Sequence, residues 1–203
     1  MMFPIALALT LAGAPNVPDL YQRSYEQEVL HDAPGALATL DQLPQGEKAT
    51  YLYALRRGWL LYLGARYGEA VEEYRRAVGL APQAVEPRLG LSLSEMAARR
   101  WLDAEKTLLE LQKLDPGGFL VNSRLAFTWY NLGRFKEAEV AYRKVLGLYP
   151  SDVEMQAGLG WALLKQGRAA DAKPVFQRVL TVAPRHASAQ AGLSECNAPA
   201  APR

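Results

Sequence analysis

The side chains that most often carry catalysis or bind metals are few in this chain of 203 residues. It contains one cysteine, Cys196, and two histidines, His31 and His186. A single cysteine forms no internal disulfide, and two distant histidines are a poor basis for a zinc or haem site. Neither histidine lies near a serine or cysteine in an arrangement that would activate a nucleophile. We therefore predict no catalytic residue, no metal ligand and no cofactor-binding residue.

Two other kinds of candidate motif are better explained by helix structure. Asp115 and Asp152 flank prolines or expected helix starts, where carboxylates commonly cap the backbone. The glycine-containing segments LGLSLSE and AGLGWAL are interpreted as helix segments with small residues for packing, so no phosphate-binding loop is expected. The sequence therefore does not predict an enzyme.

The charged residues are balanced. The chain has 23 Lys and Arg against 21 Asp and Glu, which gives a formal net charge of +2, and both signs are spread along its length. Proteins that bind along the phosphate backbone of nucleic acids usually carry a basic stripe or patch, and no such stripe is evident in this sequence. Nucleic acid is therefore not an expected partner.

A period of 34 residues runs through most of the sequence. Prolines occur at 82, 116, 150 and 184, alanines at 70, 104, 138 and 172, and large side chains at 74, 108, 142 and 176. Self-similarity at a fixed period of this length is typical of repeat proteins built from stacked units. The positions that recur must therefore perform the same structural task in each unit.

The segment NLGRFKEAEVAYRKVLGLYPSD, residues 131–152, shows what those tasks are. A first helix over about 120–132 is expected to end near Gly133, because glycine adopts the left-handed conformation without a Cβ penalty. A second helix over about 135–148 then places Ala138 and Tyr142 on one face, the small residue at the closest helix approach and the large one beyond it. Pro150 ends this helix. Ser151 to Glu154 is predicted to be a capping box that starts the next unit.

This pattern of Gly, Ala, Tyr and Pro positions resembles that of the tetratricopeptide repeat. The resemblance implies an all-α fold, an α-solenoid of antiparallel helix pairs in a right-handed superhelix. We assign four repeats to residues 51–186, a shortened leading helix pair to 15–50, and a capping helix with a tail to 187–203. The turn LGARYGEA at 63–70 is predicted to carry one residue more than LGRFKEA at 132–138, which would shift its first helix by one.

The resemblance also implies where a partner would bind. In this family the concave surface is lined mainly by first helices, and most of the corresponding positions here are apolar or aromatic. The predicted groove residues are Leu52, Leu55, Trp59, Tyr62, Leu89, Leu93, Met96, Phe127, Tyr130, Asn131, Trp161 and Leu164. Aromatic side chains with a polar tip are favoured interface anchors. The alternative interpretation is that the same side chains only pack between neighbouring repeats.

The predicted function is a non-catalytic scaffold or adaptor that binds a peptide or a partner subunit in this groove. The alternative from another class is a carbohydrate-binding subunit for export or modification of an envelope polymer, with a glycan chain stacked on the aromatic faces. Chaperone-binding members of the family hold a carboxylate with Lys, Asn and Arg side chains. The matching positions here carry Leu55, Trp59, Leu89 and Ser123, and Arg124 is the only strong carboxylate partner nearby, so that clamp is not expected.

The first residues suggest export. An apolar run from Phe3 to Ala14 is too short to span a membrane but suits the apolar region of a secretory signal, and Ala12-Gly13-Ala14 matches a small-x-small cleavage site. Residues 1–14 are therefore predicted to be a signal peptide of a periplasmic or secreted protein. Together with a composition rich in Ala, Leu, Arg and Gly, this favours a bacterial envelope assembly. The alternative is a cytoplasmic protein in which this segment is an apolar N-terminal helix packed on the domain.

Overall fold

The computed structural model describes residues 16–198, and all regular structure within that range is α-helical. The predicted signal peptide therefore lies outside the described residues. The first helices of the pairs are α1 (Val17–Val29), α4 (Tyr51–Leu63), α6 (Glu86–Ala97), α8 (Phe119–Asn131) and α10 (Val153–Lys165), followed by α12 (Ala187–Asn197). The second helices are α2 (Ala33–Leu40), α5 (Tyr67–Leu80), α7 (Trp101–Leu114), α9 (Phe135–Leu148) and α11 (Ala169–Val182). A short helix, α3 (Gln45–Lys48), links α2 to α4.

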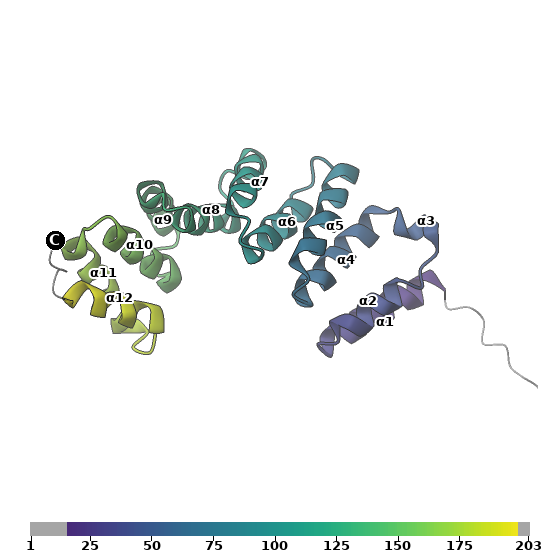
Figure 1. Ribbon diagram of the computed structural model, residues 1–203, viewed down its shortest axis with the longest axis horizontal. Helices are drawn as coiled ribbons and strands as arrows, with labels where there is room; N and C mark the ends of the chain where they lie inside the picture. Colours follow the sequence, from purple (N-terminus) through teal and green to yellow (C-terminus); the bar gives the residue numbers. More distant parts are fainter. Residues whose placement is uncertain (1–15, 199–203) are drawn as a thin grey trace, which may run out of the picture.

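Consecutive helices pack on one another along the whole described chain. Apart from α2, which packs on α4 across the short α3, contacts that skip one helix join first helices to first helices: α4 to α6, α6 to α8, α8 to α10 and α10 to α12. The array is elongated and curved, and its two ends turn towards the same side (Figure 1). The first helices are therefore the ones drawn together by the curvature, as expected for a solenoid of repeats. The predicted all-α solenoid of antiparallel helix pairs is confirmed.

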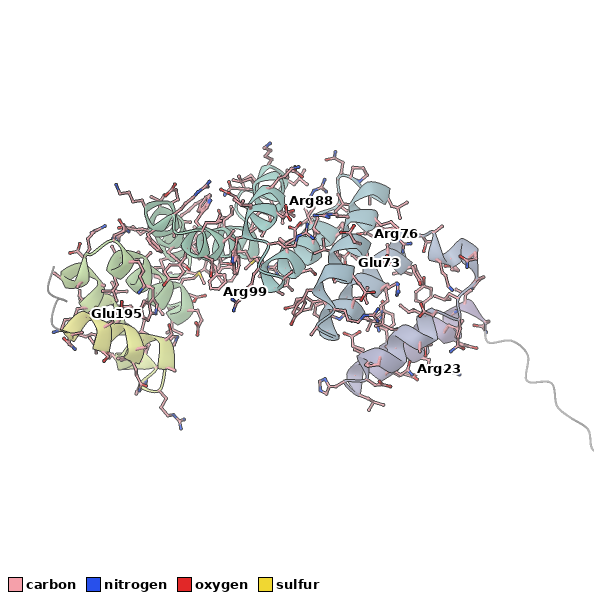
Figure 2. All side chains as sticks on the ribbon, in the orientation of Figure 1. Arg23, Glu73, Arg76, Arg88, Arg99 and Glu195 are labelled. Atoms are coloured by element: carbon pink, nitrogen blue, oxygen red, sulfur yellow. The ribbon has the colours of Figure 1, made fainter. Side chains whose placement is uncertain are left out.

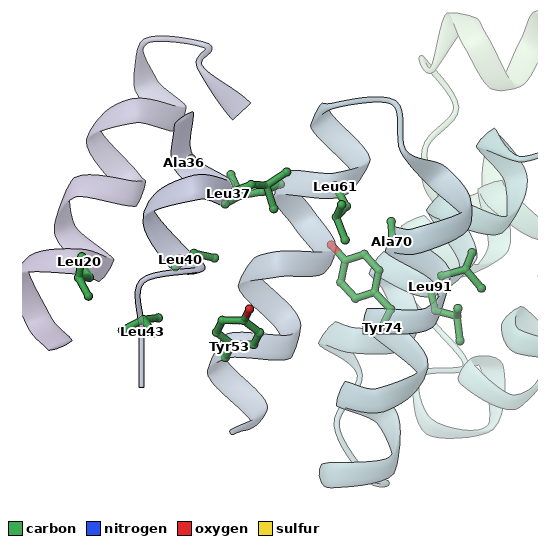
Figure 3. Close-up of a cluster of buried hydrophobic side chains, with 12 residues drawn as sticks. Leu20, Ala36, Leu37, Leu40, Leu43, Tyr53, Leu61, Ala70, Tyr74 and Leu91 are labelled. Carbon is green, nitrogen blue, oxygen red and sulfur yellow. The ribbon is translucent and has the colours of Figure 1, made fainter. Parts of the chain in front are cut away.

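The core is held by a large side chain of each second helix that packs against the next first helix. Tyr74 of α5 lies so close to Gly90 of α6 that a Cβ at position 90 would sit 2.2 Å from the Tyr74 ring. Tyr142 of α9 meets Gly158 of α10 in the same way, at 2.5 Å. Figure 3 shows Tyr74 within the N-terminal core cluster, between Leu61 and Leu91. The glycines are thus required for the close approach of neighbouring repeats.

The turn between the two helices of a pair uses a left-handed residue at the same position in every repeat. This residue is His31, Ala65, Arg99, Gly133 and Gly167 in successive pairs, with φ between 56° and 77°. The expectation that Gly133 ends the first helix is therefore met. The expected extra residue in the turn at 63–70 is wrong, because Ala65 rather than Gly64 takes the left-handed position and α4 begins and ends 68 residues before α8.

The predicted capping box at Ser151 to Glu154 is also wrong in its register. The cap of α10 is Asp152, whose carboxylate accepts a hydrogen bond from the Met155 backbone N–H at 2.9 Å. Aspartate accepts this bond as well as serine does, and its charge also suits the positive end of the helix dipole. Asp152 is therefore the capping residue that the sequence suggested, and Ser151 precedes the helix.

Exchanging alanine and glycine at the left-handed turn positions is expected to change stability in opposite directions. Ala65→Gly should raise the free energy of unfolding by about 0.5–1 kcal/mol, because relief of left-handed strain exceeds the added flexibility of the unfolded chain. Gly133→Ala should lower it by about 1 kcal/mol. Urea unfolding of the two variants measures both changes. Equal and small changes of the same sign would show that the turn backbone is not strained at Ala65.

One carboxyl group is buried within the core. Glu95 of α6 is 1% exposed, and its Oε2 atom has no hydrogen-bond partner among the described residues. The nearest cation is the Arg75 guanidinium, 3.6 Å from Oε1. Burial raises the pKa of Glu95, and a hydrogen bond from Thr107 opposes that rise. The equivalent positions in the two neighbouring repeats are Leu61, which is buried, and Trp129, which is partly buried.

Glu95→Leu is therefore expected to stabilise the fold at neutral pH by about 1–3 kcal/mol, because a buried charged group is replaced by an apolar one. The folded state holds the Glu95 proton more tightly than the unfolded state, so the carboxyl group destabilises the fold increasingly as pH rises through the raised pKa. The increase in the free energy of unfolding caused by Glu95→Leu should thus become smaller as the pH falls. Unfolding curves at neutral and acidic pH test this, and a variant that is less stable at both would contradict it.

Candidate functional site

The concave side contains two hollows lined by first helices. The C-terminal hollow has a volume of about 630 Å³ and lies over α6, α8, α10 and α12. The N-terminal hollow has a volume of about 500 Å³ and lies over α1, α4 and α6, with Arg124 of α8 at its border. Of the predicted groove residues, Met96, Phe127, Tyr130 and Trp161 line the C-terminal hollow, and Leu52, Leu55, Trp59, Leu89 and Leu93 line the N-terminal hollow. Volumes of this size are typical of ligand-binding clefts.

Three predicted groove residues lie outside both hollows. Tyr62 is part of a row of rings, with its centroid 5.6 Å from that of Trp59 and 5.5 Å from that of Tyr67. Asn131 donates a hydrogen bond back to the Phe127 carbonyl at 2.8 Å. Leu164 is half-buried against the C-terminal core cluster. Tyr62 and Asn131 thus contact residues that line a hollow, whereas Leu164 packs against the core.

The two tryptophans each have a structural contact as well as a face on a hollow. The indole N–H of Trp59 donates to Glu28 Oε1 at 2.6 Å, and that of Trp161 donates to Ser188 Oγ at 2.8 Å. Trp161 also packs edge-on against Phe176, with ring centroids 5.6 Å apart. Each of these tryptophans therefore lines a hollow and also packs between neighbouring helices.

Phe127 is the most exposed aromatic side chain among the predicted groove residues. It is 45% exposed, lines the C-terminal hollow and contacts the edge of Trp101 at a centroid distance of 5.9 Å. An exposed phenylalanine in a concave surface gains free energy when a ligand covers it, because apolar area leaves water. Phe127 is therefore the residue whose exposure argues most directly for a ligand.

Charged groups also border the two hollows, and most of them are paired. Lys165 Nζ lies 2.8 Å from Glu195, and His186 Nε2 lies 3.0 Å from Glu154. Arg124 lines both hollows and is the charged residue that they share. Burial lowers the pKa of its guanidinium, although arginine stays protonated at physiological pH. The charged side chains of the molecule as a whole are spread along its length (Figure 2).

The two end helices contribute groove residues that were not predicted from the sequence. Ser188 of α12 follows Glu154 by one 34-residue period, and Tyr25 and Glu28 of α1 precede Trp59 and Tyr62 by the same period. Continuing the repeat phase beyond residues 51–186 would have found all three. The period therefore locates groove positions even in the end helices, where the consensus residues are absent.

The histidine and cysteine side chains at the C-terminal end of the array have structural surroundings. Residues 16–198 contain no group of three or more His, Cys, Asp and Glu side chains placed to hold a metal ion. His186 caps α12 by accepting a hydrogen bond from the Ala189 backbone N–H at 3.1 Å. Cys196 is half-buried near the end of α12, with a pKa raised by burial. Over the same range, no helix has the length and apolar character that crossing a membrane requires.

Comparison with solved structures identifies the same architecture in other proteins. MamA (41-end) from Desulfovibrio magneticus RS-1 aligns over 86% of this chain and 99% of its own, with a TM-score of 0.77 and 16% identity. MamA AMB-1 aligns over 81% of this chain and 98% of its own, with a TM-score of 0.72 and 22% identity. TTC0263, a thermophilic TPR protein in Thermus thermophilus, aligns over 88% and 97%, with a TM-score of 0.63 and 15% identity. At these identities the likeness establishes the fold.

Sequence comparison gives the family. No curated protein matches the sequence directly. Two family models, both described as tetratricopeptide repeat, match residues 130–196 and 89–153. Together they span 89–196, more than half of the chain, and the 34-residue turn and helix positions continue outside that span. The chain therefore belongs to the tetratricopeptide repeat family.

Proposed function

We propose that this protein is a non-catalytic interaction scaffold whose concave groove binds a segment of a partner protein. The observation that carries the proposal is the pair of hollows on the first helices, with the exposed Phe127 in one and the exposed Leu52 in the other. Apolar anchors that enter pockets of this kind supply most of the affinity in protein interfaces. Fold alone does not fix function, so the proposal rests on the groove and not on the family.

A peptide segment fits the groove better than a glycan does. A sugar ring stacks on a free aromatic face, but one face of the Trp59 ring is already stacked on Tyr62 at an interplanar angle of 17°. The Lys165 amine lies over the Trp161 ring, 5.2 Å from its centroid. The hollows instead present aliphatic and aromatic walls of the size that Leu, Phe or Met side chains fill.

Direct binding separates the two classes of ligand. The purified protein is exposed in parallel to a displayed library of random peptides and to an array of bacterial envelope oligosaccharides. We expect enrichment of peptides with bulky apolar residues and no retention of oligosaccharides. Retention of oligosaccharides without peptide enrichment would contradict the proposal and favour the carbohydrate-binding function.

We also propose that the scaffold works within a bacterial envelope assembly after export. The support is the apolar run from Phe3 to Ala14 with its Ala12-Gly13-Ala14 site, together with the Ala, Leu, Arg and Gly-rich composition. Intact-mass measurement of the protein made in its own host should give a chain that begins near Pro15. Full-length protein in the cytosol would contradict export.

A further inference from the structure

Two arginines occupy equivalent places in the solenoid, two repeats apart. Arg56 of α4 and Arg124 of α8 each follow a second helix whose large core residue is a leucine, Leu40 and Leu108 respectively. Where that residue is Tyr74, Tyr142 or Phe176, the corresponding positions are Gly90, Gly158 and Gly192. The arginine side chains therefore fill space that an aromatic ring takes in the other repeats.

The buried guanidinium of Arg56 has both hydrogen-bond acceptors and a carboxylate partner within the protein. Arg56 is 5% exposed and donates to the Ser24 carbonyl at 2.8 Å and to the Ser24 hydroxyl at 3.1 Å. Its guanidinium also forms an ion pair with Glu28 of α1 and lies over the Tyr25 ring. Partial burial works to raise the pKa of Glu28, but hydrogen bonds from Trp59 and Arg56 lower it overall. The positive charge of Arg56 is therefore balanced by the Glu28 carboxylate of the same chain.

Arg124 also donates to a backbone carbonyl and to a serine hydroxyl, but it has no carboxylate partner. It donates to the Leu89 carbonyl at 2.6 Å and to the Ser92 hydroxyl at 3.1 Å, and Ser92 is equivalent to Ser24. The position equivalent to Glu28 is Met96. Within residues 16–198 no carboxylate forms a salt bridge with Arg124. A half-buried cation without a counter-charge is unfavourable unless something supplies one.

The acidic residues of the two hollows are engaged elsewhere. Glu154 lies 3.0 Å from the His186 ring and Glu195 lies 2.8 Å from Lys165. Glu86 accepts a hydrogen bond from the Tyr51 hydroxyl at 3.2 Å. Arg124 thus remains the one groove cation whose carboxylate must come from outside the described chain. An arginine with free N–H groups recognises a carboxylate through charge-assisted hydrogen bonds.

We propose that the groove binds an internal Asp or Glu side chain of the partner segment at Arg124, with apolar side chains of that segment in both hollows. This rests on the proposed function. Arg124 lines both hollows, so a segment that fills both must continue on either side of it. A C-terminal carboxylate would leave one hollow empty, whereas an acidic side chain within the segment would not. The recognition sequence is therefore an acid flanked on both sides by bulky apolar residues.

The test uses two displayed libraries of random peptides, one fused at both ends to the carrier and one with free C-termini. We expect wild-type protein to enrich apolar-acid-apolar sequences from the library fused at both ends. Apolar sequences without an acid would overturn the inference and leave the proposed function standing. Enrichment only from the library with free C-termini would contradict binding of an internal acidic side chain and favour binding of a terminal carboxylate. No enrichment from either library would overturn both the inference and the proposed function.

Met96→Glu is the matched variant, because it restores at Arg124 the carboxylate that Glu28 provides at Arg56. It should keep the helical circular-dichroism spectrum but lose the selection for an acid. Replacing the acid of a selected peptide by its amide should weaken binding to wild type at least tenfold and to Met96→Glu less than twofold. Arg124→Met should behave as Met96→Glu does. An undiminished preference for the acid in both variants would overturn the assignment to Arg124.

Discussion

Tyr142→Ala is expected to destabilise the C-terminal half of the array by about 3–5 kcal/mol, because removal of a buried aromatic side chain leaves a cavity. Tyr142 is 3% exposed and fills the space against Gly158, which has no Cβ that could fill part of that cavity. In a solenoid each repeat contacts only its neighbours, so the damage should be local. Amide hydrogen exchange should accelerate in α8 to α11 and stay close to wild type in α1 to α5.

Val140→Ala is the control on the same helix. Val140 is 69% exposed, so its truncation should change the free energy of unfolding by less than about 0.5 kcal/mol. If Tyr142→Ala were no more harmful than Val140→Ala, the ring of Tyr142 would not be holding α9 against α10. Uniform loss of protection over all helices would contradict the local coupling of the repeats.

Phe127→Ala is expected to weaken binding of a selected apolar peptide by about 2 kcal/mol, which is about 30-fold in affinity. The fold should change little, by about 1 kcal/mol, since the side chain is 45% exposed before the ligand binds. Phe127 separates binding from folding better than Trp161 does, because Trp161 also packs on Phe176 and bonds to Ser188. Titration of the labelled peptide, with unfolding curves of the same protein samples, measures both effects.

Val140→Ala also serves as the control for binding, since it truncates an exposed apolar side chain of a second helix. Its affinity for the peptide should equal that of wild type. Unchanged binding by Phe127→Ala, together with weaker binding by Val140→Ala, would place the ligand on the second helices. The groove would then be packing space between repeats, as the alternative interpretation of the aromatic residues holds.

The helix pairs were predictable because the residues that pack the helices together, form the turns and end the helices all recur with the same 34-residue period. The expected second helix over 135–148 coincides with α9, and the expected first helix over 120–132 is displaced by one residue from α8. The turn at 63–70 was misread because glycine is the usual sign of the left-handed position. Here Gly64 is the C-cap and Ala65 adopts the positive φ. An alanine does not indicate a left-handed conformation, so the sequence alone did not predict it.

The groove was predictable in outline but not in its details. Nine of the twelve side chains that the family resemblance implied for the groove line the hollows, because first helices face the concave side. Repeat phase did not show that Trp59 and Trp161 are anchored by Glu28 and Ser188, since those contacts depend on the end helices. The lack of a carboxylate partner for Arg124 follows only from comparing two repeats in three dimensions, because nothing in the sequence alone relates Ser92 and Met96 to Arg124.

The most direct test of the central claim, that the first helices form the binding surface, is hydrogen exchange of the protein with and without a saturating selected peptide. Bound peptide should slow amide exchange in α6, α8 and α10, which line the hollows, and leave the second helices α7 and α9 unchanged away from their contacts with these helices. Protection confined to α5, α7 and α9 would contradict the account.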